Sequence, residues 1–259
     1  MNKKSENRRE RSNFEAEWQR RFQEFADNDD DAAIAGWSES GLQARLRNFA
    51  RLWENAQPGE QWLDAGCGAG TYTRFMASQG AKVTGLDYSL PTLMKARGKQ
   101  PSAAGWCVGD VTHLPVAPAS VDGALCFGVM QALANSEPAV RELHTAVKAG
   151  GEVWIDALNV WCPPNFYDAF RRRIAGRPLH VRYESPTEFK ALMQSAGFTD
   201  VRLHWVPILP ARWQRLQWLL ETGWARFMFR FVPPLGALLS HAFVMSGKKS
   251  LTDSKELPS

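Results

Sequence analysis

Short apolar runs separated by helix-like stretches make up most of this chain from residue 61 onward. Seven runs have the length and composition of strands: 61–65, 81–86, 105–109, 121–128, 150–155, 201–206 and 239–249. Between several of them, apolar residues recur every three or four positions, which is the spacing of an amphipathic helix. Strands that alternate with helices predict an α/β protein with a largely parallel sheet.

Two helical patterns precede the first strand. The first has aromatic residues on helical spacing: Phe14, Trp18, Phe22 and Phe25. The acidic stretch 27–31 ends this pattern. Ser40 and Gln43 have the spacing of a capping box, so we expect a second helix to begin at Ser40 and to run towards residue 53.

A glycine-rich loop follows the first strand and suggests a ligand site. Asp64 ends the strand, and Gly66, Gly68 and Gly70 follow on alternate positions, where they allow a sharp turn close to a ligand. A dinucleotide fingerprint would need glycine where this chain has Thr71. A carboxylate also attracts an ammonium group and repels a pyrophosphate, so the loop suits a cationic ligand better. A glycine-rich turn without a ligand is the simpler alternative.

With these residues the chain resembles the class I S-adenosylmethionine-dependent methyltransferases of the small-molecule type, whose first motif is an acid followed by G-x-G-x-G. Three further landmarks follow in order, namely Asp87 after the second strand, Asp110 after the third, and the fourth-strand run 121–128. The resemblance implies a doubly wound, Rossmann-like sheet of seven strands, mostly parallel with an antiparallel last strand. It also implies that N-terminal helices cover the cofactor cleft, although the first helix would equally suit simple packing against the sheet edge.

The resemblance assigns S-adenosylmethionine as the cofactor. Asp64 would contact its amino group through the loop, Asp87 its ribose hydroxyls, and Asp110 its adenine amino group, beside the ring of Tyr88. The full implied set is Asp64, Gly66, Cys67, Gly68, Gly70, Asp87, Tyr88, Asp110, Val111, Cys126 and Phe127. The expected reaction is in-line methyl transfer to an oxygen, nitrogen or carbon of the acceptor, in which the protein mainly supplies proximity. An NAD-dependent oxidoreductase and a non-catalytic S-adenosylmethionine-binding module remain the alternatives.

A hydroxyl acceptor would need a general base, and the sequence does not single one out. The candidates are His144, His180, His204 and Tyr183, each of which would equally suit a structural role. We expect the acceptor wall to include Phe127, Met130 and Gln131.

The segment 212–231 combines a stripe of apolar and aromatic residues with a stripe of arginines. It predicts a basic amphipathic helix or helix pair, broken at Gly223 and stopped by prolines at 233 and 234. Such a helix could contact a membrane periphery, line the site of a lipid-like acceptor, or pack as a simple lid. We divide the chain into an N-terminal arm with cap helices (1–57), a cofactor-binding core (58–158), an acceptor-side half (159–249) and a polar tail (250–259).

Composition argues against nucleic acid binding, a metal site and secretion. The net charge of +4 over 259 residues is too small to suggest nucleic acid binding. The four cysteines form no C-x-x-C pair and the five histidines have no ligand spacing, so we expect buried thiols and no metal. The N-terminus is charged without an apolar run behind it, so we expect a cytoplasmic protein without a secretory signal. A peripheral location at the membrane is the alternative that segment 212–231 leaves open.

Overall fold

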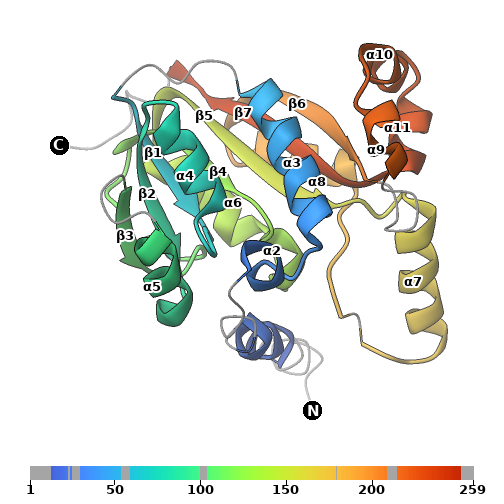
Figure 1. Ribbon diagram of the computed structural model, residues 1–259, viewed down its shortest axis with the longest axis horizontal. Helices are drawn as coiled ribbons and strands as arrows, with labels where there is room; N and C mark the ends of the chain where they lie inside the picture. Colours follow the sequence, from blue (N-terminus) through green and yellow to red (C-terminus); the bar gives the residue numbers. More distant parts are fainter. Residues whose placement is uncertain are drawn as a thin grey trace.

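The computed structural model describes residues 13–22, 24, 30–53, 59–99, 104–178, 180–208 and 215–251. Seven strands form one twisted sheet in the order β3-β2-β1-β4-β5-β7-β6 (Figure 1). The strands are β1 (Gln61–Ala65), β2 (Lys82–Asp87), β3 (Ala104–Val108), β4 (Val121–Cys126), β5 (Val147–Leu158), β6 (Phe198–Pro207) and β7 (Ser240–Lys249). β1 to β5 run parallel, while β7 is antiparallel to both β5 and β6. The predicted sheet is therefore confirmed.

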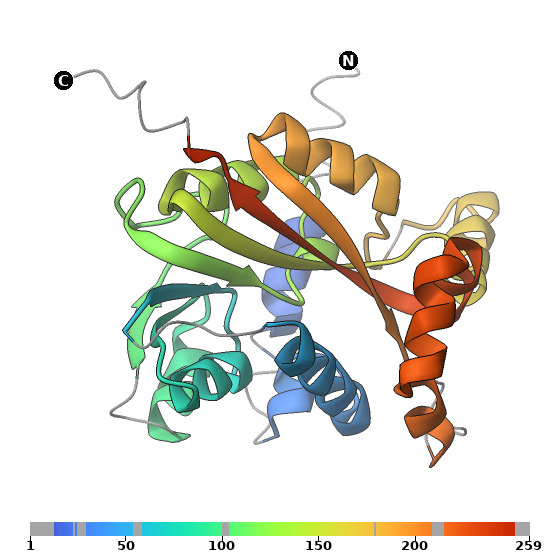
Figure 2. The ribbon, with the colours of Figure 1, turned by 90° about the horizontal axis from the view of Figure 1, so that it is seen from above.

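Helices cover both faces of this sheet. They are α2 (Asp31–Ile34), α3 (Glu39–Leu52), α4 (Thr71–Ser78), α5 (Leu90–Lys99), the 3-10 turn η1 (Met130–Ala132), α6 (Glu137–Ala146), α7 (Pro163–Ile174), α8 (Pro186–Ser195), α9 (Gln217–Leu220), α10 (Gly223–Phe231) and α11 (Pro233–Leu239). Residues 13–22 are also helical. Figure 2 shows α3 and α4 on one side of the sheet and α6 and α8 on the other.

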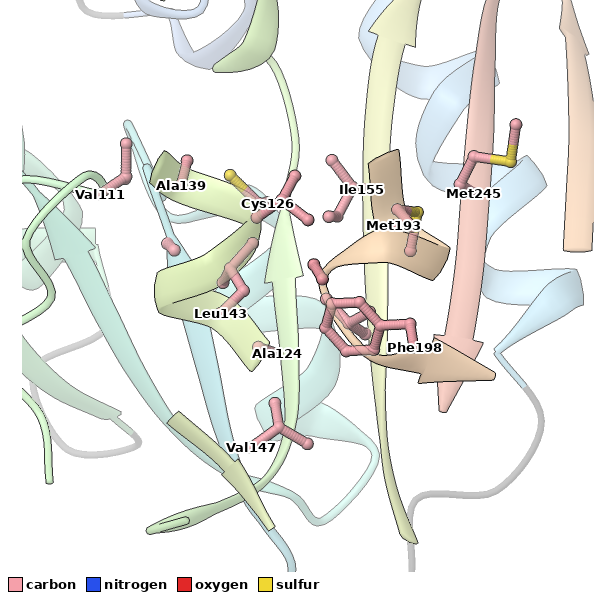
Figure 3. Packing of buried hydrophobic residues seen from close by; sticks show 14 of the residues in the cluster. Val111, Ala124, Cys126, Ala139, Leu143, Val147, Ile155, Met193, Phe198 and Met245 are labelled. Carbon is pink, nitrogen blue, oxygen red and sulfur yellow. The ribbon is translucent and has the colours of Figure 1, made fainter. Parts of the chain in front are cut away.

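The alternation of side chains along the strands divides the core into two apolar layers. In β5, Val153 and Ile155 pack in the layer under α6 and α8, whereas Trp154 between them faces the layer under α3 and α4. Figure 3 shows the first layer, in which Leu143 of α6 and Met193 of α8 lie against the strands. Because both faces of the central strands are buried, these strands read as continuous apolar runs in the sequence.

Two helix starts test the expected caps. Ser185 caps α8 as predicted, with its hydroxyl accepting the Glu188 N–H at 3.5 Å and Pro186 in the first turn. The prediction that Ser40 begins the second helix is wrong, because Ser38 is the cap and accepts the Gly41 N–H at 3.2 Å. Gln43 donates to Glu39 and so does not close the expected box.

The basic segment before the last strand is a run of three short helices in its described part. Thr222 caps α10 by accepting the Ala225 N–H at 3.2 Å, so the chain breaks just before Gly223 as expected. α10 ends at Phe231, and the proline pair then opens α11. Arg212 and Trp213 lie outside the described residues, as does Phe25 of the first helical pattern. None of the helices in the described ranges has the length and apolar character that crossing a membrane would require.

Candidate active site

A deep cleft opens at the carboxyl ends of β1, β2, β3 and β4, where the connecting loops meet. Its volume is about 1150 Å³ including the open mouth, which is the scale of a site for a cofactor-sized ligand. Its walls include the glycine loop, the end of β2 and residues 109–112, 127–129 and 132–133, and its roof comes from residues between 15 and 42. The cleft lies where open α/β sheets generally bind ligands, at the change of strand order beside β1.

The glycine loop is held against β2, and two of its glycines, Gly66 and Gly68, line the cleft. The N–H groups of Gly66 and Cys67 both donate to the Leu86 carbonyl, at 2.7 and 2.9 Å. Gly66 has a φ of +80°, and a Cβ there would lie 2.2 Å from the Val129 side chain, so this position serves packing. Gly68 has a φ of +51°, and a Cβ there would meet no atom within 4 Å. Of the three loop glycines, Gly68 is therefore the one at which a side chain would enter open space rather than meet protein atoms.

Asp87 links this loop to the end of β2. Its Oδ2 accepts the Gly68 N–H at 3.0 Å, and its Oδ1 accepts the Ser89 N–H at 2.9 Å. Burial raises the pKa of the Asp87 carboxyl, and the backbone N–H donors oppose that rise. Because carboxylate oxygens can each accept more than one hydrogen bond, Asp87 keeps acceptor capacity towards a ligand in the cleft.

Asp64 lies behind the loop, outside the cleft lining, and is 1% exposed. Its Oδ2 accepts the Thr73 hydroxyl at 2.6 Å. Burial raises the pKa of Asp64 to about 7, and the negative charge of Asp87 adds to this rise. The group can therefore take up or release a proton near neutral pH, and a cation bound on the other side of the loop would favour its charged form.

The structure brings most of the other expected cofactor residues together. Cys67, Tyr88, Asp110, Val111 and Phe127 line the cleft together with Gly66, Gly68 and Asp87. Gly70 and Cys126 do not line it. Gly70 caps α4 with its Cα against the ring of Trp106, and Cys126 is fully buried in the layer under α6 (Figure 3).

The N-terminal helix covers the cleft, which decides between its two expected roles. Glu15 and Trp18 line the cleft, and the Glu15 carboxylate accepts the Ala134 N–H at 3.0 Å. The Tyr88 hydroxyl donates to the Gln19 carbonyl at 3.0 Å. At the other side of the roof, Asp31 accepts hydrogen bonds from Thr71, Arg74 and Lys99. Asp31 therefore connects the roof of the cleft to α4 and α5.

Two features of the cleft had no clear signal in the sequence. Tyr72 lines the cleft and is 6% exposed, and its hydroxyl has no hydrogen-bond partner among the described residues. Arg45 forms a buried ion pair with Asp156 at 3.3 Å, and Asp156 also accepts the Gly128 N–H at 2.6 Å. The Arg45 guanidinium lies 4.5 Å from the ring centre of Trp37, another residue of the cleft wall. The position of Arg45 on the apolar face of α3 was the one sign in the sequence of this buried ion pair.

None of the four expected candidates for a general base lines the cleft. His204 packs on Trp154, shares a hydrogen bond with Ser246 at 2.9 Å, and has a pKa lowered to about 4 by burial. His144 packs edge-on against Phe198 at 4.9 Å. Both lie outside the lining described above.

The other two candidates lie beside α7. His180 is 3.5 Å from Asp168, and burial lowers its pKa. The Tyr183 hydroxyl donates to Asp168 at 3.3 Å, and burial raises the pKa of Tyr183 to about 12. Of the expected acceptor wall, Phe127 lines the cleft, whereas Met130 and Gln131 are buried beside it. In the described part of the chain, no cluster of three potential metal ligands is present.

The comparisons with known proteins agree with this fold and cleft. The profile of the family described as Methyltransferase domain matches residues 63–155. The malonyl-[acyl-carrier protein] O-methyltransferase of Pseudescherichia vulneris is 36% identical over 109 residues, which are 42% of this chain and 43% of that protein. The ubiquinone/menaquinone biosynthesis C-methyltransferase of Rubrivivax gelatinosus is 29% identical over 178 residues, covering 61% of this chain and 70% of that protein.

The structure of magnesium protoporphyrin IX methyltransferase from Synechocystis PCC 6803, with bound S-adenosylhomocysteine, superposes with a TM-score of 0.60 at 14% identity. It covers 94% of this chain and 99% of that one. This chain spans half or less of the length of the malonyl-[acyl-carrier protein] O-methyltransferases that it matches. The fold is that of the class I S-adenosylmethionine-dependent methyltransferases. Within this chain, residues 63–155 are similar to the family described as Methyltransferase domain.

Proposed function

We propose that this protein is an enzyme that transfers a methyl group from S-adenosylmethionine to a small-molecule or lipid-like acceptor. The observation that carries the proposal is the cleft in which the open backbone of Gly68 and the carboxylate of Asp87 face the same space. The family match and the named methyltransferase relatives support it.

The residues present fit this cofactor. Asp87 would accept hydrogen bonds from the ribose hydroxyls. The negative charge of Asp64 would attract the positively charged amino group on the other side of the loop. The unpartnered Tyr72 hydroxyl is a buried polar group of the kind that a polar ligand satisfies. The carboxylates of Asp64 and Asp87, so close to the loop, would repel the pyrophosphate of a nicotinamide dinucleotide. Thr71 stands where the dinucleotide fingerprint needs glycine, and its hydroxyl donates to Asp31.

When bound, the cofactor supplies an electrophilic methyl group on a sulfonium. The chain's own contribution is to hold both reactants close and to exclude water with the roof formed by residues 13–22 and α2. No histidine is among the cleft-lining residues that the structure describes. We therefore propose that alignment, rather than a histidine base, provides most of the rate enhancement.

Two acceptor classes follow from the relatives, whose names specify a malonyl-[acyl-carrier protein] and ubiquinone/menaquinone biosynthesis. We favour a lipid-like acceptor and peripheral contact with a membrane, because the helices before β7 expose aromatic side chains beside arginines. The apolar face that α10 turns towards solvent supports this choice over a simple lid.

The test is incubation with methyl-labelled S-adenosylmethionine and each acceptor class separately, namely a malonylated acyl carrier protein and a demethylated isoprenoid quinone. Transfer of label to the quinone supports the proposal in full, and transfer to the carrier protein alone replaces the lipid-like acceptor. A protein that binds S-adenosylhomocysteine but labels neither acceptor, nor any component of a membrane extract, is a binding module and contradicts the enzyme proposal.

A further inference from the structure

Exposed apolar side chains are concentrated in two parts of this molecule. Among the described residues, fourteen of the eighteen large hydrophobic side chains that are exposed belong to residues 161–174 and 216–239. These two segments are far apart in the sequence. Single exposed apolar residues are ordinary in soluble proteins, but a concentration of this size marks an interaction surface.

The first segment is centred on α7, whose apolar face is exposed in the described part of the chain. Phe166, Phe170 and Ile174 are 58%, 51% and 72% exposed and recur at a spacing of four residues on one side of the helix. The only buried residue of α7 is Asn165, which is polar. An amphipathic helix normally buries its apolar stripe in the core, and α7 does not.

The second segment has the same character. Trp224, Phe227 and Phe231 of α10 are 73%, 56% and 63% exposed and lie at positions i, i+3 and i+7, which form one stripe. On the other side of α10, Ala225 and Phe229 are buried, and α10 packs against α9 and α11. The exposed stripe is therefore not the face that holds this helix in place.

The two segments meet at the end of the sheet. The Asn165 side chain donates to the carbonyls of Asn159 and His241, at 2.8 and 3.0 Å. The Asn159 side chain in turn donates to the carbonyls of Ala237 and Ser240, at 2.7 and 2.8 Å. These four bonds join the start of α7 to the junction of α11 and β7. Figures 1 and 2 both place α7 and α9–α11 at the end of the molecule away from β3.

The charge beside both apolar faces is positive. The last turn of α7 contains Arg171, Arg172 and Arg173, and Arg177 follows it. The acidic residue of this helix, Asp168, forms an ion pair with Arg172 at 3.1 Å. In the second segment, Arg226 of α10 is exposed, and the carboxylate of Glu221 is paired with Arg47 at 2.8 Å. An apolar face flanked by arginines complements an anionic lipid surface, in which aromatic rings insert and guanidinium groups meet phosphates.

We propose that α7 and α9–α11 together form one docking surface for an anionic membrane. This deepens the peripheral contact proposed above by adding α7, which lies outside the basic segment 212–231. A second copy of the chain is the less favourable occupant, because pairing this surface with itself would bring the arginines of both copies together. The inference does not depend on methyl transfer.

The test is co-sedimentation of the full chain with vesicles of phosphatidylcholine and phosphatidylglycerol, compared with phosphatidylcholine alone, at low and high salt. We expect binding to the anionic vesicles that weakens with salt. Replacing Phe166, Phe170 and Ile174 by serine should lower the partition coefficient about tenfold or more, and so should the matched serine variant of Trp224, Phe227 and Phe231.

The control variant changes Leu90 and Met94 to serine. These residues of α5 are 55% and 67% exposed and lie outside the docking surface, so the control should bind vesicles as the parent does. If the α7 variant binds like the parent, α7 is not part of the surface and the inference fails. If the parent ignores anionic vesicles at low salt, the inference also fails, and sedimentation equilibrium then shows whether the surface joins two copies. S-adenosylhomocysteine binding, measured on every variant, separates these outcomes from failure of the proposed activity.

Discussion

The substitution Gly68→Ala adds one methyl group and tests whether the cofactor lies against this residue. Its effect on the stability of the free protein and its effect on cofactor affinity have different causes and can be measured separately. Gly68 has a φ of +51°, and a Cβ at this position would meet no protein atom within 4 Å. In the free protein, Gly68→Ala should therefore cost only the left-handed backbone strain of about 1–2 kcal/mol. In the complex, the methyl group would occupy cleft space that the cofactor needs, and such overpacking costs about 1–3 kcal/mol. The expected loss of affinity is about 5- to 150-fold.

Gly80 provides a matched control for this experiment. It lies in the turn after α4, outside the cleft, with a φ of +94° and no atom within 4 Å of a built Cβ. Gly80→Ala should lower the free energy of unfolding, measured in urea, and leave the affinity for S-adenosylhomocysteine unchanged in calorimetry. If Gly68→Ala binds S-adenosylhomocysteine as tightly as Gly80→Ala does, the cofactor does not lie against Gly68 and the assignment of the cleft is refuted.

Three further changes test individual side chains of the site. Asp87→Asn should weaken S-adenosylhomocysteine binding by about 1.5–3 kcal/mol in calorimetry, because charge-assisted bonds are lost, and Asp122→Asn at the other end of the sheet should not. Unchanged affinity of the Asp87 variant would remove that residue from the site. Burial raises the pKa of Asp64 from 3.8 to about 7 in the folded protein, so between these values the folded state keeps a proton that the unfolded state has released. The free energy of unfolding of the parent, relative to Asp64→Asn, should therefore fall as pH rises from about 4 to about 7, and a difference independent of pH in urea melts would contradict this. Tyr72→Phe should leave the free protein at least as stable, since the hydroxyl has no protein partner, but should weaken binding of the cofactor or the acceptor. Equal affinities and equal KM values for parent and variant would show that this hydroxyl meets no ligand.

The sheet and the glycine loop were predictable because their signals are local. A strand buried on both faces is a continuous apolar run, and an acid at its end falls at the edge where parallel strands meet, so Asp87 could be placed beside Gly68 from sequence alone. The cap of α8 was predictable for the same reason, since Ser185 and Glu188 are three residues apart.

The remaining features depend on contacts between distant residues, which the sequence pattern does not contain. The start of α3 is a local exception, because Ser38 and Ser40 are both good caps by residue type and the structure shows that Ser38 is the one used. Nothing near Asp31 in the sequence predicts its ion pair with Lys99, which helps to close the roof. The histidines resemble catalytic residues by type alone, and burial away from the cleft is a property of the folded chain.

The most direct test of the account is the choice of ligand by the purified protein. We predict that S-adenosylhomocysteine binds in calorimetry with a dissociation constant on the order of micromolar, and raises the unfolding temperature, because a ligand in excess stabilises the folded state. Nicotinamide dinucleotides should do neither. Binding of a nicotinamide dinucleotide without binding of S-adenosylhomocysteine would contradict the assignment of this cleft to a methyltransferase.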